Sequence, residues 1–89
     1  MRARRVDLNH RDILEEAQYY GFDSLDLSTL GHGDPDALLS DASDMWLVEF
    51  KSEHGKLSQR QIDRHQRWRG KPILVVRSFQ EFMEKIKKG

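Results

Sequence analysis

Hydrophobic and polar positions follow two periods along the chain, and the changes of period predict seven elements. A helical period covers residues 6–22, with Gly21 as its stop. Its apolar positions are Leu8, Ile13, Leu14, Ala17 and Tyr20. Alternating or continuous apolar runs at 23–29, 36–39 and 45–51 predict three short strands, separated by polar turns. The run at 45–51 is apolar on both faces, which is typical of a strand inside a sheet.

The remainder of the chain predicts a helix, a strand and a final helix. Ser58 and Gln61 have the spacing of a capping box, and Gly70 ends the helix that they begin. The aliphatic run at 71–77 predicts a buried strand. A second capping box, Ser78 with Glu81, opens the last helix, whose apolar stripe is Phe79, Phe82, Met83 and Ile86. The predicted order, α-β-β-β-α-β-α, belongs to the α/β class.

Composition narrows the class of protein. A chain of 89 residues is one domain, which we assign to residues 1–89. It has no cysteine, so disulfides and thiolate zinc sites are excluded. No apolar run approaches the roughly 20 residues of a membrane span, and the basic start lacks the apolar stretch of a signal peptide. We expect a soluble cytoplasmic protein with no membrane partner.

The net charge is zero, but acidic and basic residues are unevenly distributed along the chain. Residues 1–50 contain 4 Lys or Arg and 11 Asp or Glu, whereas residues 51–89 contain 11 Lys or Arg and 4 Asp or Glu. An acidic half is suited to a metal ion and a basic half to phosphate. From the split alone, ordinary solvated helix faces are the preferred interpretation.

Two charged residues stand out in the apolar strand at 45–51. Glu49 and Lys51 are two residues apart, so both point to the same face. Asp36 begins the preceding strand after the Pro35 turn, and the short loop between the strands predicts a hairpin that brings Asp36 close to Glu49. Two carboxylates at that separation repel unless a cation such as Mg²⁺ lies between them. The alternative, a surface hairpin with an ordinary Glu–Lys pair, is favoured by the triplet alone and is matched once Asp36 is included.

The stretches "GHGDPDALL" and "MWLVEFKSEHGKLSQRQIDRHQRW" resemble the VRR-NUC (virus-type replication–repair nuclease) family of PD-(D/E)xK nucleases. The resemblance extends over almost the whole chain and is greatest to the small standalone type of phages and prophages. It implies a restriction-endonuclease-like fold, with a central mixed sheet flanked by helices.

The resemblance also implies roles for particular residues. Asp36 matches the aspartate of the PD motif, Glu49 and Lys51 match the E-x-K pair, and Gln61 matches the glutamine of the L-[ST]-x-x-Q signature. These four would be catalytic. One Mg²⁺ or Mn²⁺ per site would be held by Asp36, Glu49 and the backbone carbonyl of Phe50.

Related nucleases carry a further acidic residue on the first helix. Asn9, His10 and Asp12 lie near the expected place, and Glu15 and Glu16 follow one turn later. We take the first three as the first-helix contributors to the site.

Basic residues in the second half would bind DNA. Arg60, Arg64 and Arg67 recur at i, i+4 and i+7 and so share one helix face, which would hold phosphates or simply keep the helix soluble. The basic arm at residues 1–6 would contact DNA or be disordered. We expect Trp68 to pack among apolar neighbours rather than to stack on a base.

These inferences converge on a metal-dependent endonuclease that hydrolyses phosphodiester bonds of branched or junction DNA. It would be a homodimer and a phage or prophage product expressed in a bacterial host. The alternative is a non-catalytic DNA-binding or assembly subunit that retains the nuclease fold.

Overall fold

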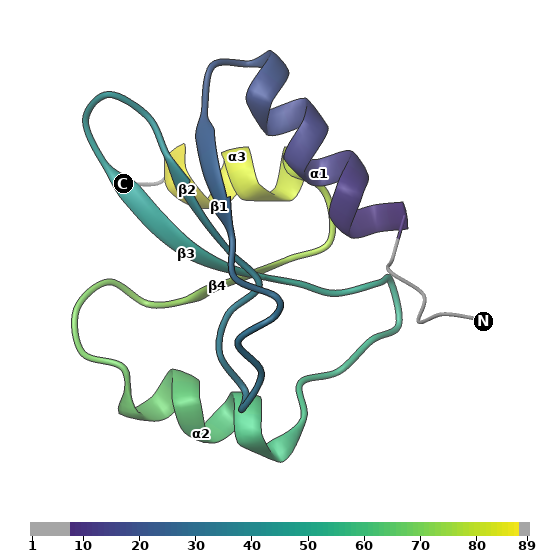
Figure 1. Cartoon of the computed structure of the whole chain (residues 1–89), viewed down its shortest axis with the longest axis vertical. Coiled ribbons are helices and arrows are strands. Elements are labelled where there is room, and N and C mark those ends of the chain that lie inside the picture. The colour runs from purple at the N-terminus through teal and green to yellow at the C-terminus, as the bar shows by residue number, and fades with distance from the viewer. Residues whose placement is uncertain (1–7, 88–89) are drawn as a thin grey trace.

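The computed structural model describes residues 8–87 and shows the predicted order of elements (Figure 1). The elements are α1 (Leu8–Tyr19), β1 (Asp23–Asp26), β2 (Ala37–Ser40), β3 (Met45–Phe50), α2 (Gln59–Arg67), β4 (Leu74–Val76) and α3 (Phe79–Lys87). The basic arm at residues 1–6 lies outside the described residues. The α/β class is therefore confirmed.

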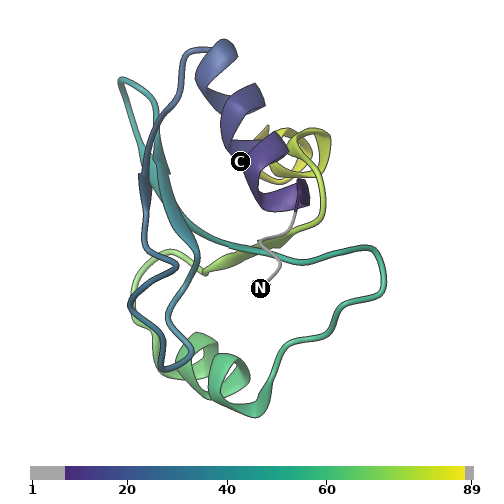
Figure 2. The ribbon, with the colours of Figure 1, turned by 45° about the vertical axis from the view of Figure 1, so that its right-hand side comes forward.

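The four strands form one mixed sheet in the order β1-β2-β3-β4. The first three strands are antiparallel, and β4 joins β3 in parallel after the crossover through α2. The strand at 45–50 is thus interior, as its apolar pattern predicts. Helices α1 and α3 cover one face of the sheet, while α2 lies at the end of the sheet where β2 begins and β3 ends (Figure 1 and Figure 2).

The core lies between the sheet and the pair α1 and α3. Its strand side chains alternate with outward-facing ones, as the pleat requires. Phe82 is fully buried and makes edge contacts with the rings of Phe22 and Trp46. The buried core residues are Ile13, Ala17, Phe22, Ala37, Leu39, Val48, Phe50, Val76, Phe79 and Phe82. The predicted apolar stripe of the last helix faces this core.

Two predicted strands are shorter by three residues or more in the structure, those at 23–29 and 71–77. β1 ends at Asp26 because the Asp26 carboxylate accepts hydrogen bonds from the backbone N–H and the hydroxyl of Ser28, which turns the chain. All of β1 is exposed, as befits an edge strand. The predicted strand at 71–77 keeps only Leu74–Val76, the part that pairs with β3.

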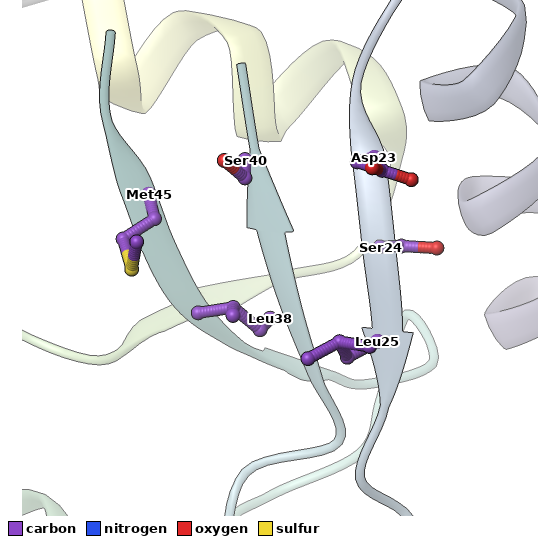
Figure 3. Close-up of a pocket in the computed structure, with 6 residues that line it drawn as sticks. All are labelled: Asp23, Ser24, Leu25, Leu38, Ser40 and Met45. Atoms are coloured by element: carbon purple, nitrogen blue, oxygen red, sulfur yellow. The ribbon is translucent and has the colours of Figure 1, made fainter. Parts of the chain in front are cut away.

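The outer face of the sheet carries an apolar hollow. Leu25 on β1 and Leu38 on β2 are paired in the register, and together with Met45 on β3 they line it (Figure 3). Leu25 and Met45 are mainly exposed to solvent. None of the helices within residues 8–87 has the length and apolar character that crossing a membrane requires.

Candidate metal centre

The hairpin of β2 and β3 places Asp36 opposite Glu49. Ala37 pairs with Val48 in the register, so the residues next to them, Asp36 and Glu49, share the outer face. The backbone N–H of Asp36 donates to the carbonyl of Val48 at 3.0 Å. The Asp36 carboxylate in turn accepts a hydrogen bond from the backbone N–H of Phe50 at 2.9 Å. Asp36 is therefore held at the end of the sheet by two contacts to the main chain of β3.

Glu49 is the only polar residue that the fold buries among residues 10–87, with 1% of its surface exposed. Its Oε2 accepts a hydrogen bond from the Gln61 amide nitrogen at 2.7 Å and lies 3.8 Å from the Lys51 ammonium. Its Oε1 is buried and has no hydrogen-bond donor in the described part of the chain. A buried acceptor without a donor is costly, so this oxygen is chemically suited to a cation or a proton.

The surroundings of Glu49 disfavour its charged form. Burial, followed by the charge of Asp36 and a hydrogen bond shared with it, raises the pKa of Glu49 to about 8, while the Lys51 ammonium opposes the rise. Two carboxylates can share a hydrogen bond only through a proton. A raised pKa means that Glu49 tends to keep its proton near neutral pH unless a positive charge compensates it.

Gln61 links the start of α2 to the metal centre. The side-chain oxygen of Gln61 accepts a hydrogen bond from the backbone N–H of Ser58 at 2.8 Å. The backbone N–H of Gln61 donates to the Ser58 hydroxyl at 3.2 Å, as the predicted capping box requires. Because the amide oxygen is used in the cap, the amide nitrogen must face Glu49. One residue therefore begins the helix and orients the buried carboxylate.

The glycine turn before Asp36 docks on the same helix. Gly33 has a φ of +82°, and a Cβ there would lie 2.7 Å from the backbone oxygen of Arg60. Asp34 forms an ion pair with Arg64, with 2.9 Å between Oδ1 and the guanidinium. The turn and α2 are thus joined by a close approach of their backbones and by an ion pair.

This ion pair separates the three predicted DNA-binding arginines. Arg60 and Arg67 are exposed, whereas Arg64 is half-buried and committed to Asp34. The i, i+4, i+7 pattern correctly places the three on one helix, but it does not identify a buried partner for one of them.

His65 is a neighbour of the centre that sequence reasoning did not assign. Its Nε2 is buried without a hydrogen-bond partner among residues 8–87. Burial lowers the pKa of His65, and the charge of Lys51 lowers it further, so the imidazole next to Lys51 is neutral. Its position four residues after Gln61, on the same helix face, was the available signal.

The predicted first-helix contributors do not gather at the centre. His10 packs edge-on against the Phe50 ring and lies 4.0 Å from Asp26, both on the core side of the sheet. Asp12 lies in a shallow groove along α1, together with Glu15, Glu16 and Tyr19. The side chain of Asn9 lies outside the described residues. Within residues 8–87 no third Asp, Glu or His joins Asp36 and Glu49 in a metal-binding cluster.

The donor set of Asp36 and Glu49 nevertheless fits one hard divalent ion. Mg²⁺ binds through one or two carboxylates and keeps several waters, so it needs no larger protein cage. Among the described residues, the buried Oε1 of Glu49 is an oxygen without a donor. Burial first, and the charge of Asp36 second, raise the pKa of Glu49, so a positive charge placed here would stabilise the carboxylate. The carbonyl of Phe50 as a further ligand remains a prediction.

Trp68 departs from its predicted environment. It caps the C-terminal end of α2 and is 43% exposed, rather than packed among apolar neighbours. The amphipathic pattern of the helix is misleading here because α2 buries none of its residues fully.

Comparisons with known proteins add no assignment: no protein-family model, curated protein or solved structure matches the chain.

Proposed function

We propose that the protein is a Mg²⁺- or Mn²⁺-dependent endonuclease that hydrolyses phosphodiester bonds in DNA. The observation that carries the proposal is the buried Glu49 beside Asp36. One of its oxygens has no donor within residues 8–87, and an ammonium group lies 3.8 Å from the other. A cluster of this kind lowers stability, so it calls for a chemical purpose.

The resemblance to the VRR-NUC family, and with it a restriction-endonuclease-like fold, forms part of the proposal. Its support is that motif pieces far apart in the sequence come into contact. Asp36 from the PD motif, Glu49 and Lys51 from E-x-K, and Gln61 from the helix signature meet at one end of the sheet.

Each residue has a task in the proposed reaction. Asp36 and Glu49 hold the ion, and Gln61 keeps the Glu49 carboxylate oriented. When bound, the ion would lower the pKa of water and neutralise charge on the scissile phosphate. Lys51 lies where an ammonium group would orient the attacking water or stabilise negative charge in the transition state. Exposed Arg60 and Arg67 would hold neighbouring phosphates.

Branched or junction DNA is the proposed substrate, and a homodimer the proposed assembly. Two copies would supply two active sites for paired cuts across a symmetric junction. Leu25 and Met45 on the outer sheet face are exposed apolar side chains of the kind that such a dimer would bury. The protein would act in the cytoplasm of a bacterial host, as a phage or prophage product.

A cleavage assay tests the proposal. Purified protein is incubated with four-way junction, flap and linear duplex DNA in Mg²⁺, Mn²⁺ or EDTA. We expect metal-dependent cutting that is lost in Asp36→Asn and retained in the matched control Asp63→Asn, whose side chain is exposed on α2. The proposal is falsified if the wild type cuts none of these substrates with either metal.

One observation favours the second candidate, a non-catalytic DNA-binding or assembly subunit. Burial raises the pKa of Glu49 to about 8, so a proton could take the place of a metal ion at this carboxyl group near neutral pH. Calorimetric titration with Mn²⁺ at pH 8 separates the two candidates. A subunit of this kind would bind DNA without taking up the ion, whereas the nuclease would take up both.

A further inference from the structure

The exposed indole of Trp68 is unusual beside the other tryptophan of the chain. Trp46 packs edge-on against Phe22 and Phe82, and Lys71 lies over its ring. Trp68, in contrast, contacts no aromatic ring among residues 8–87 and leaves 43% of its surface in water. An exposed indole contributes little to packing of the core. Its exposed ring face is, however, available to stack on a ligand.

The surroundings of Trp68 are basic and hollowed. A hollow at the C-terminal end of α2 is lined by Gln66, Arg67, Trp68, Arg69 and Gly70. Two arginines therefore line the same hollow as Trp68, and no Asp or Glu of the described part of the chain lines it. Gly70, at a φ of +110°, turns the chain there and adds no side chain to fill the space.

The hollow is within reach of the proposed metal centre. Gln61, which donates to Glu49, and Trp68 belong to the same helix and its cap, seven residues apart along the chain. At a rise of about 1.5 Å per residue, they are separated by roughly 10 Å along the helix axis. That length corresponds to about three nucleotides of a stacked strand.

We infer that this hollow binds an unpaired nucleobase of DNA, with the base stacked on Trp68 and the adjoining phosphates held by Arg67 and Arg69. Every nucleobase has a face that can stack on an aromatic ring, but only an unpaired base exposes it, and guanidinium groups supply the backbone attraction. A protein partner would need apolar surface around the indole, which the lining does not provide. The link to cleavage rests on the proposed function: the enzyme would prefer DNA with an unpaired nucleotide a few positions from the cut.

Binding measured in EDTA tests the site without any cleavage. Fluorescence anisotropy of a labelled 12-nucleotide oligothymidylate gives its Kd for wild type, Trp68→Ala, Trp68→Phe and Tyr19→Ala. We expect Trp68→Ala to raise the Kd roughly 5- to 150-fold and Trp68→Phe to retain most of the affinity. Tyr19→Ala, which removes a still more exposed aromatic ring from the acidic groove of α1, should leave the Kd unchanged. A fully paired duplex should bind the Trp68→Ala protein almost as well as the wild type.

Two results would overturn the inference: single-strand affinity unchanged in Trp68→Ala, or equal losses for single-stranded and duplex DNA. These outcomes are separate from failure of the proposed function. A protein that cuts nothing, yet binds single strands through Trp68, would contradict the proposed nuclease activity and support the base-binding site. A protein that cuts DNA with no dependence on Trp68 in binding or cleavage would do the reverse.

Discussion

Val48 and Glu49 are adjacent in β3 and equally buried, but they face opposite sides of the sheet. Val48, 0% exposed, packs among the apolar side chains below α1 and α3, where removing it from water is favourable. Glu49, 1% exposed, faces Asp36, Lys51 and Gln61, and its burial penalises its charged form. Burial therefore has opposite consequences on the two sides of one strand. On the core side it stabilises the fold, and on the other side it disfavours the ionised Glu49 carboxylate.

The contacts that hold the side chains in place also differ between the two sides of the sheet. The core side depends on many nondirectional contacts, such as the ring cluster around Phe82. The site depends on a few directional ones, among them the hydrogen bonds of Asp36 and Gln61. Substitutions on the core side should lower stability, whereas substitutions at the site should lower activity and leave the fold intact.

The largest stability change is expected on the core side. Phe82→Ala leaves a cavity among Phe22, Trp46 and Phe79 and should lower the free energy of unfolding by about 3–5 kcal/mol. Gln80→Ala, an exposed position on the same helix, should change it by less than about 0.5 kcal/mol. Urea denaturation monitored by circular dichroism measures both. Equal, small effects would show that α3 does not hold the core.

The matching change on the site side is Lys51→Ala. Loss of the ammonium group should reduce the rate of DNA cleavage by about 10²- to 10³-fold, since one electrostatic contact to the transition state is removed. DNA affinity should remain near that of the wild type. Lys56→Ala, an exposed lysine in the following loop, is the control. Single-turnover kinetics measure the cleavage rate of each variant. A Lys51→Ala rate equal to that of the wild type would exclude Lys51 from the chemistry.

A divalent ion bound between Asp36 and Glu49 should raise the free energy of unfolding. At a concentration about a hundred times its Kd, Mg²⁺ or Mn²⁺ should add about 2.7 kcal/mol to the free energy of unfolding. The gain should be greater at pH 8 than at pH 6, because the ion must displace the proton held by the acidic pair. Thermal denaturation with and without metal measures the effect. A rise in Tm of the same size in Asp36→Asn would place the ion elsewhere.

The smallest effect is the pH dependence of the metal-free protein. The pKa of Glu49 is raised from 4.5 to about 8 on folding, so the folded state holds a proton that the unfolded state has lost within this window. Stability must therefore fall as the pH rises from 4.5 towards 8, by about 2 kcal/mol between pH 6 and pH 8.

The variant Glu49→Gln isolates this contribution. The lowered pKa of His65 acts in the opposite direction, since it favours the folded state as the pH rises, but it is common to both proteins. Urea denaturation in EDTA at pH 6 and pH 8 should show a steeper loss in the wild type than in Glu49→Gln. Parallel pH profiles would mean that Glu49 is not protonated in the folded protein.

Much of the architecture follows from local patterns. The order of elements, the interior position of β3, the apolar stripe of α3 and the capping box of Ser58 and Gln61 all appear in the structure as the pattern predicts. Patterns of this kind succeed because the period of a strand or helix and the geometry of a cap depend on residues close together in the sequence. Local chemistry also explains the shortened β1, since Asp26 hydrogen-bonds to Ser28 two residues later.

The candidate site was only partly accessible from the sequence. Spacing along β3 places Glu49 and Lys51 on one face, and the hairpin brings Asp36 to them. The pairing of Arg64 with Asp34 and the burial of the His65 Nε2 depend on where α2 docks, thirty residues along the chain from the turn that receives it. No local period encodes that docking.

By itself, the sequence determined which residues alternate, where helices begin, and that two acids and a lysine share a strand face. These properties are set by backbone geometry within a few residues. Only the tertiary structure decided that Glu49 is buried with an oxygen lacking a donor, that His10 and Asp12 stay away from it, and that Trp68 remains exposed. Burial and electrostatic environment depend on every segment that packs nearby, and that arrangement exists only after the chain has folded.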